Sequence, residues 1–113
     1  MEMKVNDGAD GIVGVALVGR LDTPGVAQIE LRFTATLVPR AARAVVDLSQ
    51  LEFVGSLGIR MFISVARALS TKRGKLVLYA PQAPVKDVFD TVSLGEIIPV
   101  KPDAASALVA ARA

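Results

Sequence analysis

A valine-rich run that passes through a short loop into a helical pattern constrains the fold of this chain most strongly. Residues 44–48 read AVVDL, which is typical of a strand covered on at least one face of a sheet. The run leads into a loop that ends in Gly55 and Ser56. Because glycine allows a sharp turn and serine is a preferred N-cap, we expect Ser56 to cap a helix that extends to about Thr71. The stretch therefore predicts a strand, a turn and a helix in direct succession.

Strand and helix patterns alternate along the remaining sequence. Upstream, a predicted hairpin joins strands at 3–6 and 12–18 through a turn-rich segment at 7–11. The following helix has Thr23 as its expected N-cap, Pro24 in its first turn, an end before Pro39, and a buried face made of Val26, Ile29, Phe33 and Leu37. Downstream we expect strands at 75–79 and 97–98, a terminal helix at 103–112, and a helix at 81–92 that buries Val85, Val88, Phe89 and Val92.

This order of elements predicts the architecture. When successive parallel strands lie side by side, right-handed crossovers place their connecting helices on the same face of the sheet. We therefore expect an α/β fold, a one-sided βα array with a mixed, mostly parallel sheet of about four or five strands and about four helices. We expect the N-terminal strand to pair antiparallel with the next one. We find no linker, and we expect residues 1–113 to form a single domain.

Composition excludes several classes of function. The chain contains no cysteine and no histidine, so it offers neither a thiolate metal site nor the usual general base. Its net charge of +2 is too small for an electrostatic nucleic-acid binder. The sequence also lacks the two glycine-rich patterns that bind nucleotide phosphates, Gly-x-Gly-x-x-Gly and Gly-x-x-x-x-Gly-Lys-Ser/Thr. We therefore expect no catalytic activity, no metal, no cofactor and no direct contact with nucleic acid.

The beginning of the sequence bears on where the protein resides. Residues 1–7 are mixed and polar, and they lack the basic and apolar segments of a signal peptide. No apolar run reaches the roughly 18 residues that a membrane span requires. We expect a cytoplasmic protein.

Three motifs carry a resemblance to a known family. Val46-Asp47-Leu48-Ser49, followed by Phe53-Val54-Gly55-Ser56-Leu57-Gly58-Ile59, resembles the signature of the STAS domain family, the bacterial anti-sigma factor antagonists. Gly19-Arg20-Leu21-Asp22 and Gly74-Lys75-Leu76-Val77-Leu78 are similar to two further family motifs. The similarity covers roughly residues 11–100, and the loop before Ser56 is its most specific part.

The resemblance implies a regulatory binding module rather than an enzyme. In the family, the serine at the position of Ser56 is phosphorylated by a partner that is both an anti-sigma factor and a serine kinase. Only the unphosphorylated form binds this partner and thereby releases a sigma factor. The sequence departs from the family at Gly55, where aspartate is usual, and this bears on phosphorylation more than on the fold. The alternatives are a non-phosphorylated scaffold, stressosome-like or accessory to lipid transport, and a small nucleotide-binding domain.

The expected partner surface comprises six residues: Asp22, Gly55, Ser56, Leu57, Gly58 and Met61. Asp22 belongs to it because its loop and the Ser56 loop leave the same end of adjacent parallel strands. The helix after Ser56 has one apolar arc suited to the sheet and a second one made of Leu57, Met61, Val65 and Ala68. The second arc is either a partner-binding stripe or is covered by the helix at 81–92, and we expect Leu57 and Met61 to be more exposed than Val65.

Two residues have a simpler interpretation beside the functional one. Ser56 is either a phosphorylated switch or only a helix cap. Asp22 and Asp47 lie at strand ends and resemble paired catalytic carboxylates, but each can also brace its own loop by bonding nearby amides. No histidine supports the catalytic interpretation, and we favour the second one.

Overall fold

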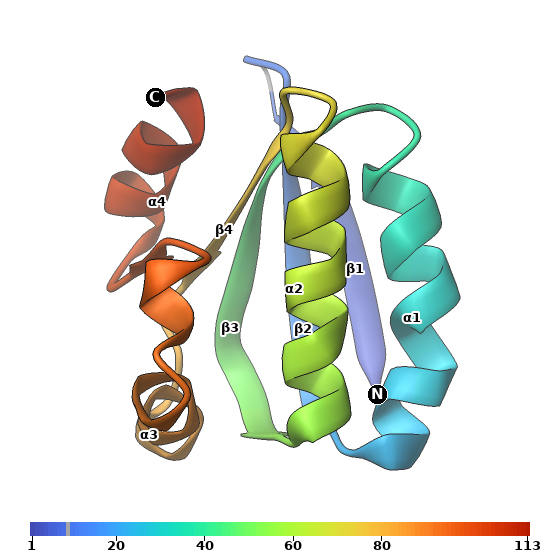
Figure 1. Ribbon diagram of the computed structural model, residues 1–113, viewed down its shortest axis with the longest axis vertical. Helices are drawn as coiled ribbons and strands as arrows, with labels where there is room; N and C mark the ends of the chain where they lie inside the picture. The colour runs from blue at the N-terminus through green and yellow to red at the C-terminus, as the bar shows by residue number, and fades with distance from the viewer. Residues whose placement is uncertain (9) are drawn as a thin grey trace.

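Five strands form one sheet in which every strand lies beside its neighbour in the sequence, in the order β1-β2-β3-β4-β5 (Figure 1). The computed structural model describes residues 1–8 and 10–113, so Ala9 of the predicted 7–11 turn lies outside the described residues. The strands are β1 Glu2–Asp7, β2 Ile12–Leu21, β3 Arg43–Val54, β4 Lys75–Tyr79 and β5 Val100–Lys101. β1 pairs antiparallel with β2, and all other pairs are parallel. The predicted fold class is confirmed.

Most strands differ from their predicted bounds, since β1 is one residue longer at each end and β2 ends at Leu21 rather than Val18. β3 continues to Val54 because it stays paired with β2, through two register shifts, as far as the pair Leu21 and Val54. The predicted strand at 97–98 is wrong. The Ile98 amide bonds the Leu94 carbonyl at 2.9 Å in a turn, and the short strand β5 begins only after Pro99.

The helices occupy both faces of the sheet, so the predicted one-sided arrangement holds for the three crossover helices and is wrong for the terminal one. They are α1 Thr23–Leu37, α2 Ser56–Ser70, α3 Ala83–Thr91, the short 3-10 helix η1 Leu94–Glu96, and α4 Ala104–Arg112. The helices α1, α2 and α3 bury side chains in the main core cluster, together with one face of the sheet. Helix α4 instead packs on the other face, where Ala107 and Ala111 join a cluster with Ile12, Val45 and Val77. The crossover rule does not constrain α4, because within the described residues no strand follows it.

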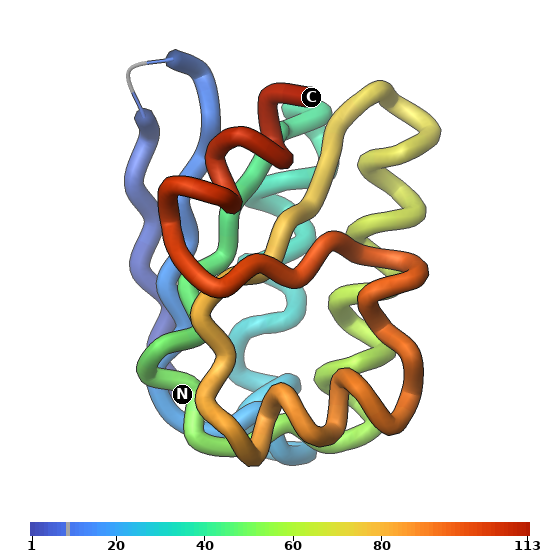
Figure 2. The backbone as a smooth tube through the Cα atoms, turned by 90° about the vertical axis from the view of Figure 1, so that its left-hand side faces the viewer, coloured from blue at the N-terminus to red at the C-terminus, as the bar shows by residue number. Residues whose placement is uncertain are grey.

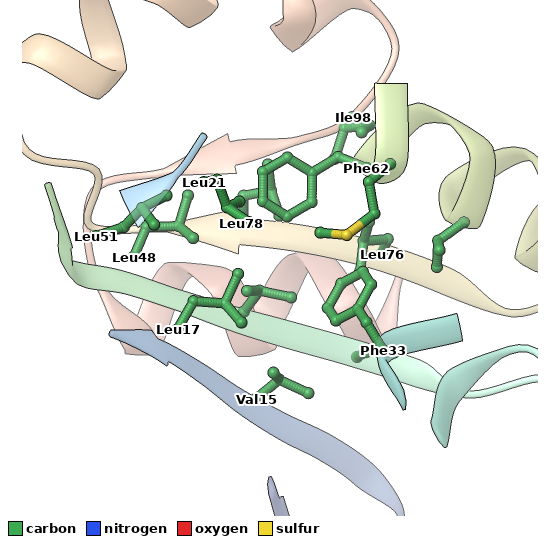
Figure 3. Packing of buried hydrophobic residues seen from close by; sticks show 14 of the residues in the cluster. Val15, Leu17, Leu21, Phe33, Leu48, Leu51, Phe62, Leu76, Leu78 and Ile98 are labelled. Atoms are coloured by element: carbon green, nitrogen blue, oxygen red, sulfur yellow. The ribbon is translucent and has the colours of Figure 1, made fainter. Parts of the chain in front are cut away.

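The main core is aliphatic, with a few phenylalanines where the helices meet. The rings of Phe33 and Phe62 are 6.0 Å apart in an edge-to-face arrangement, and those of Phe62 and Phe89 are 6.4 Å apart. These contacts join α1, α2 and α3, and Figure 3 shows Phe33 and Phe62 among the leucines of the sheet. The predicted buried face of α1 is confirmed. In α3, Val85 and Phe89 are buried as predicted, whereas Val88 is only partly buried and Val92, which follows the last helical residue, is 48% exposed.

No helix in the described part of the chain is both long and apolar enough to cross a membrane.

Candidate functional site

The loops that precede α1 and α2 lie side by side at one end of the sheet. β2 and β3 are parallel, and their last residues, Leu21 and Val54, are register partners. The Gly55 amide also donates a hydrogen bond to the Leu21 carbonyl at 3.0 Å. The predicted proximity of the Asp22 and Ser56 loops is therefore confirmed.

The start of α2 differs from the prediction by one residue. Gly55 is the N-cap, with φ −105° and ψ −175°, and Ser56 is the first helical residue, so the expectation that Ser56 caps the helix is wrong. The bond to Leu21 holds Gly55 in the extended conformation that an N-cap requires. A glycine cap leaves the first-turn amides of α2 without a side-chain acceptor. Ser56 itself is exposed, so its hydroxyl is accessible from solvent.

The start of α1 is capped by an aspartate. Asp22 Oδ1 accepts a hydrogen bond from the Gly25 amide at 2.8 Å, and Thr23 and Pro24 are the first two helical residues. Thr23 is therefore not the N-cap as predicted. The cap is Asp22, whose side chain accepts the hydrogen bond from the Gly25 amide in the first turn. Asp47 Oδ1 similarly accepts from the Ser49 amide at 2.9 Å. Asp22 therefore braces its own loop, as the non-catalytic interpretation predicts. Asp47 is not at a strand end as expected, because β3 continues to Val54, and its bond lies where the pairing with β2 shifts register.

A shallow hollow of about 310 Å³ lies between the two loops. It is lined by Leu21, Asp22, Thr23, Phe53, Gly55, Ser56 and Leu57. The side chains of Phe53 and Leu57 are 38% and 39% exposed, so apolar surface flanks the Ser56 hydroxyl. The hollow therefore combines an exposed hydroxyl with two accessible apolar side chains.

Arg20 and Phe53 are part of this surface, and the sequence interpretation did not include them. The Arg20 guanidinium carbon lies 4.6 Å from the centre of the Phe53 ring, and Arg20 Nε lies 3.7 Å from Asp22 Oδ2. Arginine stacked on an aromatic ring is a recognised attractive contact. Both residues stand within the motifs that carry the family resemblance. Their pairing depends on the register shifts between β2 and β3, which no local pattern reveals.

Two of the six predicted surface residues are buried. A Cβ on Gly58 would lie 2.9 Å from Val54 Cγ2 and 3.1 Å from Leu21 Cβ, so this glycine permits close packing of α2 on the strand ends. Met61 is 1% exposed, and the expectation that it is more exposed than Val65, at 2%, is wrong. Met61 belongs to the same buried cluster as Val85 and Phe89 of α3. The other four, Asp22, Gly55, Ser56 and Leu57, line the hollow.

Comparison with known proteins places these features in a family. The family model described as the STAS domain matches residues 1–107. BtrV of Bordetella bronchiseptica, whose name gives it as a candidate anti-sigma factor antagonist, is 31% identical over 94 residues, which cover 83% of this chain and 81% of BtrV.

Solved structures share the fold. An anti-sigma factor antagonist from Mycobacterium paratuberculosis is 25% identical, with a TM-score of 0.87 over 99% of this chain and 94% of that one. The anti-sigma factor antagonist SpoIIAA, in its unphosphorylated form, is 22% identical, with a TM-score of 0.79 over 98% of this chain and 96% of that one. At this identity, the likeness to SpoIIAA concerns the fold alone. From the match over nearly its whole length, this chain belongs to the STAS domain family.

Proposed function

We propose that this protein is an anti-sigma factor antagonist that binds its anti-sigma factor through the hollow around Ser56. The observation that carries the proposal is the exposed Ser56 hydroxyl at the start of α2, flanked by the accessible side chains of Phe53 and Leu57. Exposed apolar groups beside a polar one are typical of protein interfaces. The similarity to BtrV and to the Mycobacterium paratuberculosis protein supports the same assignment.

We further propose that phosphorylation of Ser56 by this partner, acting as a serine kinase, switches the binding off. A phosphate adds roughly −1.5 to −2 charge and would stand at the positive end of α2, so the fold itself tolerates it. The partner must instead desolvate that charge when it covers the hollow. An unpaired charge buried at an interface costs several kcal/mol, which amounts to a loss of orders of magnitude in affinity.

The test uses the cognate anti-sigma factor, with ATP and three variants. Ser56→Ala should keep the affinity in titration calorimetry and gain no phosphate by intact mass. Ser56→Asp should lose at least about a hundredfold in affinity while its melting temperature is unchanged or slightly raised. Ser64→Asp is the matched control, since Ser64 is an exposed serine on the same helix away from its first turn. It should leave the affinity unchanged.

Three results would contradict parts of the proposal. Undiminished affinity of folded Ser56→Asp would exclude the charge switch. A phosphate on Ser56→Ala would place the modification elsewhere. Tight binding without any phosphate gain by the wild-type chain would favour the non-phosphorylated scaffold.

A further inference from the structure

A second and larger hollow, of about 500 Å³, lies on the face of the sheet that carries α4. Its floor is made by Ile12, Gly14 and Val45, near the beginning of β2 and β3. One wall is the β1–β2 hairpin and the other is α4, which run beside each other in Figure 2. No residue of this hollow lines the hollow around Ser56, so the two are separate.

Polar contacts fix both walls of this hollow. Arg112 Nε of α4 donates to Asp10 Oδ2 of the hairpin at 3.0 Å, which joins the two walls directly. From the start of β3, Arg43 Nη1 donates to the carbonyls of Ala111 and Ala113 at 2.8 and 2.9 Å. The end of α4 is therefore tied to the sheet and to the hairpin.

The missing side chain of Gly14 keeps the floor open. Gly14 is the register partner of Asn6 on β1, so the two residues face the same side of the sheet. A Cβ on Gly14 would lie 3.4 Å from the Asn6 carbonyl oxygen and 3.8 Å from its Cβ, which are ordinary contacts. A larger side chain can therefore be accommodated by the backbone, and it would project into the hollow.

The polar groups around the hollow specify an uncharged ligand. Asp10 and Arg112 neutralise each other, which leaves neither charge free to hold an ion. Burial raises the pKa of the Tyr79 phenol, and the nearby Asp47 carboxylate raises it further, so the hydroxyl is protonated at neutral pH. Within residues 1–8 and 10–113, this hydroxyl has no hydrogen-bond partner. It is available to bind a polar group of a ligand.

We propose that this hollow, between the hairpin and α4, binds an uncharged, largely apolar small molecule that lies on the floor formed around Gly14 and hydrogen-bonds the Tyr79 hydroxyl. Its volume is within the roughly 300–1,000 Å³ of sites that hold small ligands, and its apolar floor with few polar groups is typical of them. The inference does not depend on the function proposed for the Ser56 hollow.

Two fluorescent probes that differ by a single charge test the proposal. N-phenyl-1-naphthylamine is neutral, and 1-anilinonaphthalene-8-sulfonate has the same skeleton with one sulfonate. The neutral probe should bind the wild-type protein saturably, at one site per chain, and the anionic probe at least about tenfold more weakly. Gly14→Leu should weaken the neutral probe by at least about tenfold, because leucine fills the floor, and Tyr79→Phe by about fivefold.

The control variant is Leu57→Ser, which removes exposed apolar surface from the Ser56 hollow and should leave probe binding unchanged. Amide chemical shifts should move at Ile12, Gly14 and Leu108 when the neutral probe is added. This map decides the question even if Gly14→Leu does not fold. Absence of saturable binding, equal or tighter binding of the anionic probe, unaltered binding by folded Gly14→Leu, or shifts confined to the Ser56 end would each overturn the proposal.

Discussion

Replacing Gly55 with aspartate should stabilise the protein, because the start of α2 has the backbone of a capped helix but no capping side chain. Gly55 is extended, with φ −105°, a conformation that any residue adopts. A Cβ at this position would lie 3.4 Å from Phe53 Cε2 and 3.7 Å from the Leu21 carbonyl oxygen, both ordinary contacts. No acidic residue stands in the first turn of α2. The aspartate side chain therefore fits, and its carboxylate would accept a hydrogen bond from the first-turn amides of α2, which have no side-chain acceptor in the wild type.

The expected gain in unfolding free energy is the sum of three favourable contributions and one unfavourable one. An aspartate cap exceeds a glycine cap by a few tenths of a kcal/mol, and a negative charge at a helix N-terminus adds about 0.3–1 kcal/mol. Restricting the unfolded chain by removing glycine adds about 0.4–1 kcal/mol. Repulsion from Asp22, which lines the same hollow and is partly neutralised by Arg20, offsets some of this. We expect a net gain of about 1 kcal/mol, or about 4 °C in melting temperature for a chain of this length.

The assay is thermal unfolding of Gly55→Asp beside Gly55→Asn. Asparagine supplies the cap and the restricted backbone without the charge, so its gain should be smaller than that of aspartate and insensitive to salt. The difference between the two variants should shrink as salt rises, because it arises from the charge. A Gly55→Asp protein that melts below the wild type would refute this account of the helix start.

Three further predictions follow from burial and pairing. Met61→Ala should cost about 2–5 kcal/mol of unfolding free energy and Leu57→Ala only about 0.5, because Met61 is 1% and Leu57 is 39% exposed; equal losses in chemical denaturation would contradict this. Gly58→Ala should destabilise by about 1 kcal/mol in the same assay, since overpacking against Val54 and Leu21 outweighs the helix propensity of alanine, and a stabilised variant would show that these side chains move aside. The Arg112 hydrogen bond lowers the pKa of Asp10, so the stabilisation it gives is present above about pH 4 and is lost as the pH falls further. Asp10→Asn should therefore melt below the wild type at pH 7 and converge with it in acid, whereas a pH-independent gap would contradict the pairing.

Much of the fold is readable from the sequence. The valine-rich run at 44–48 and the strand at 75–79 have the composition of buried strands, and both are strands in the structure. The spacing of Val26, Ile29, Phe33 and Leu37 identified the buried face of α1, because a helical repeat belongs to the segment itself. The strand at 97–98 was misassigned, since two adjacent isoleucines do not distinguish a strand from a turn that buries one of them.

The candidate site was predictable in position but not in detail. The order of strands and helices brings the loops of Asp22 and Ser56 together, and the local motifs name both residues. The register shifts that set Phe53 beside Arg20 depend instead on the pairing of β2 with β3 along their whole length. The burial of Met61 likewise depends on the other elements that contribute side chains to the main core cluster. Both features depend on contacts between segments that are far apart in the sequence.

The sequence by itself determined the element order, the family signature and the serine at the helix start. These are local properties, because a periodic pattern or a turn residue acts within a few positions of the chain. The tertiary structure alone decided which residue caps α2, which of its apolar side chains remain exposed, and that α4 covers the second face of the sheet and forms a wall of the larger hollow. The physical reason is that burial and close packing depend on what each surface meets, and that partner comes from another part of the chain.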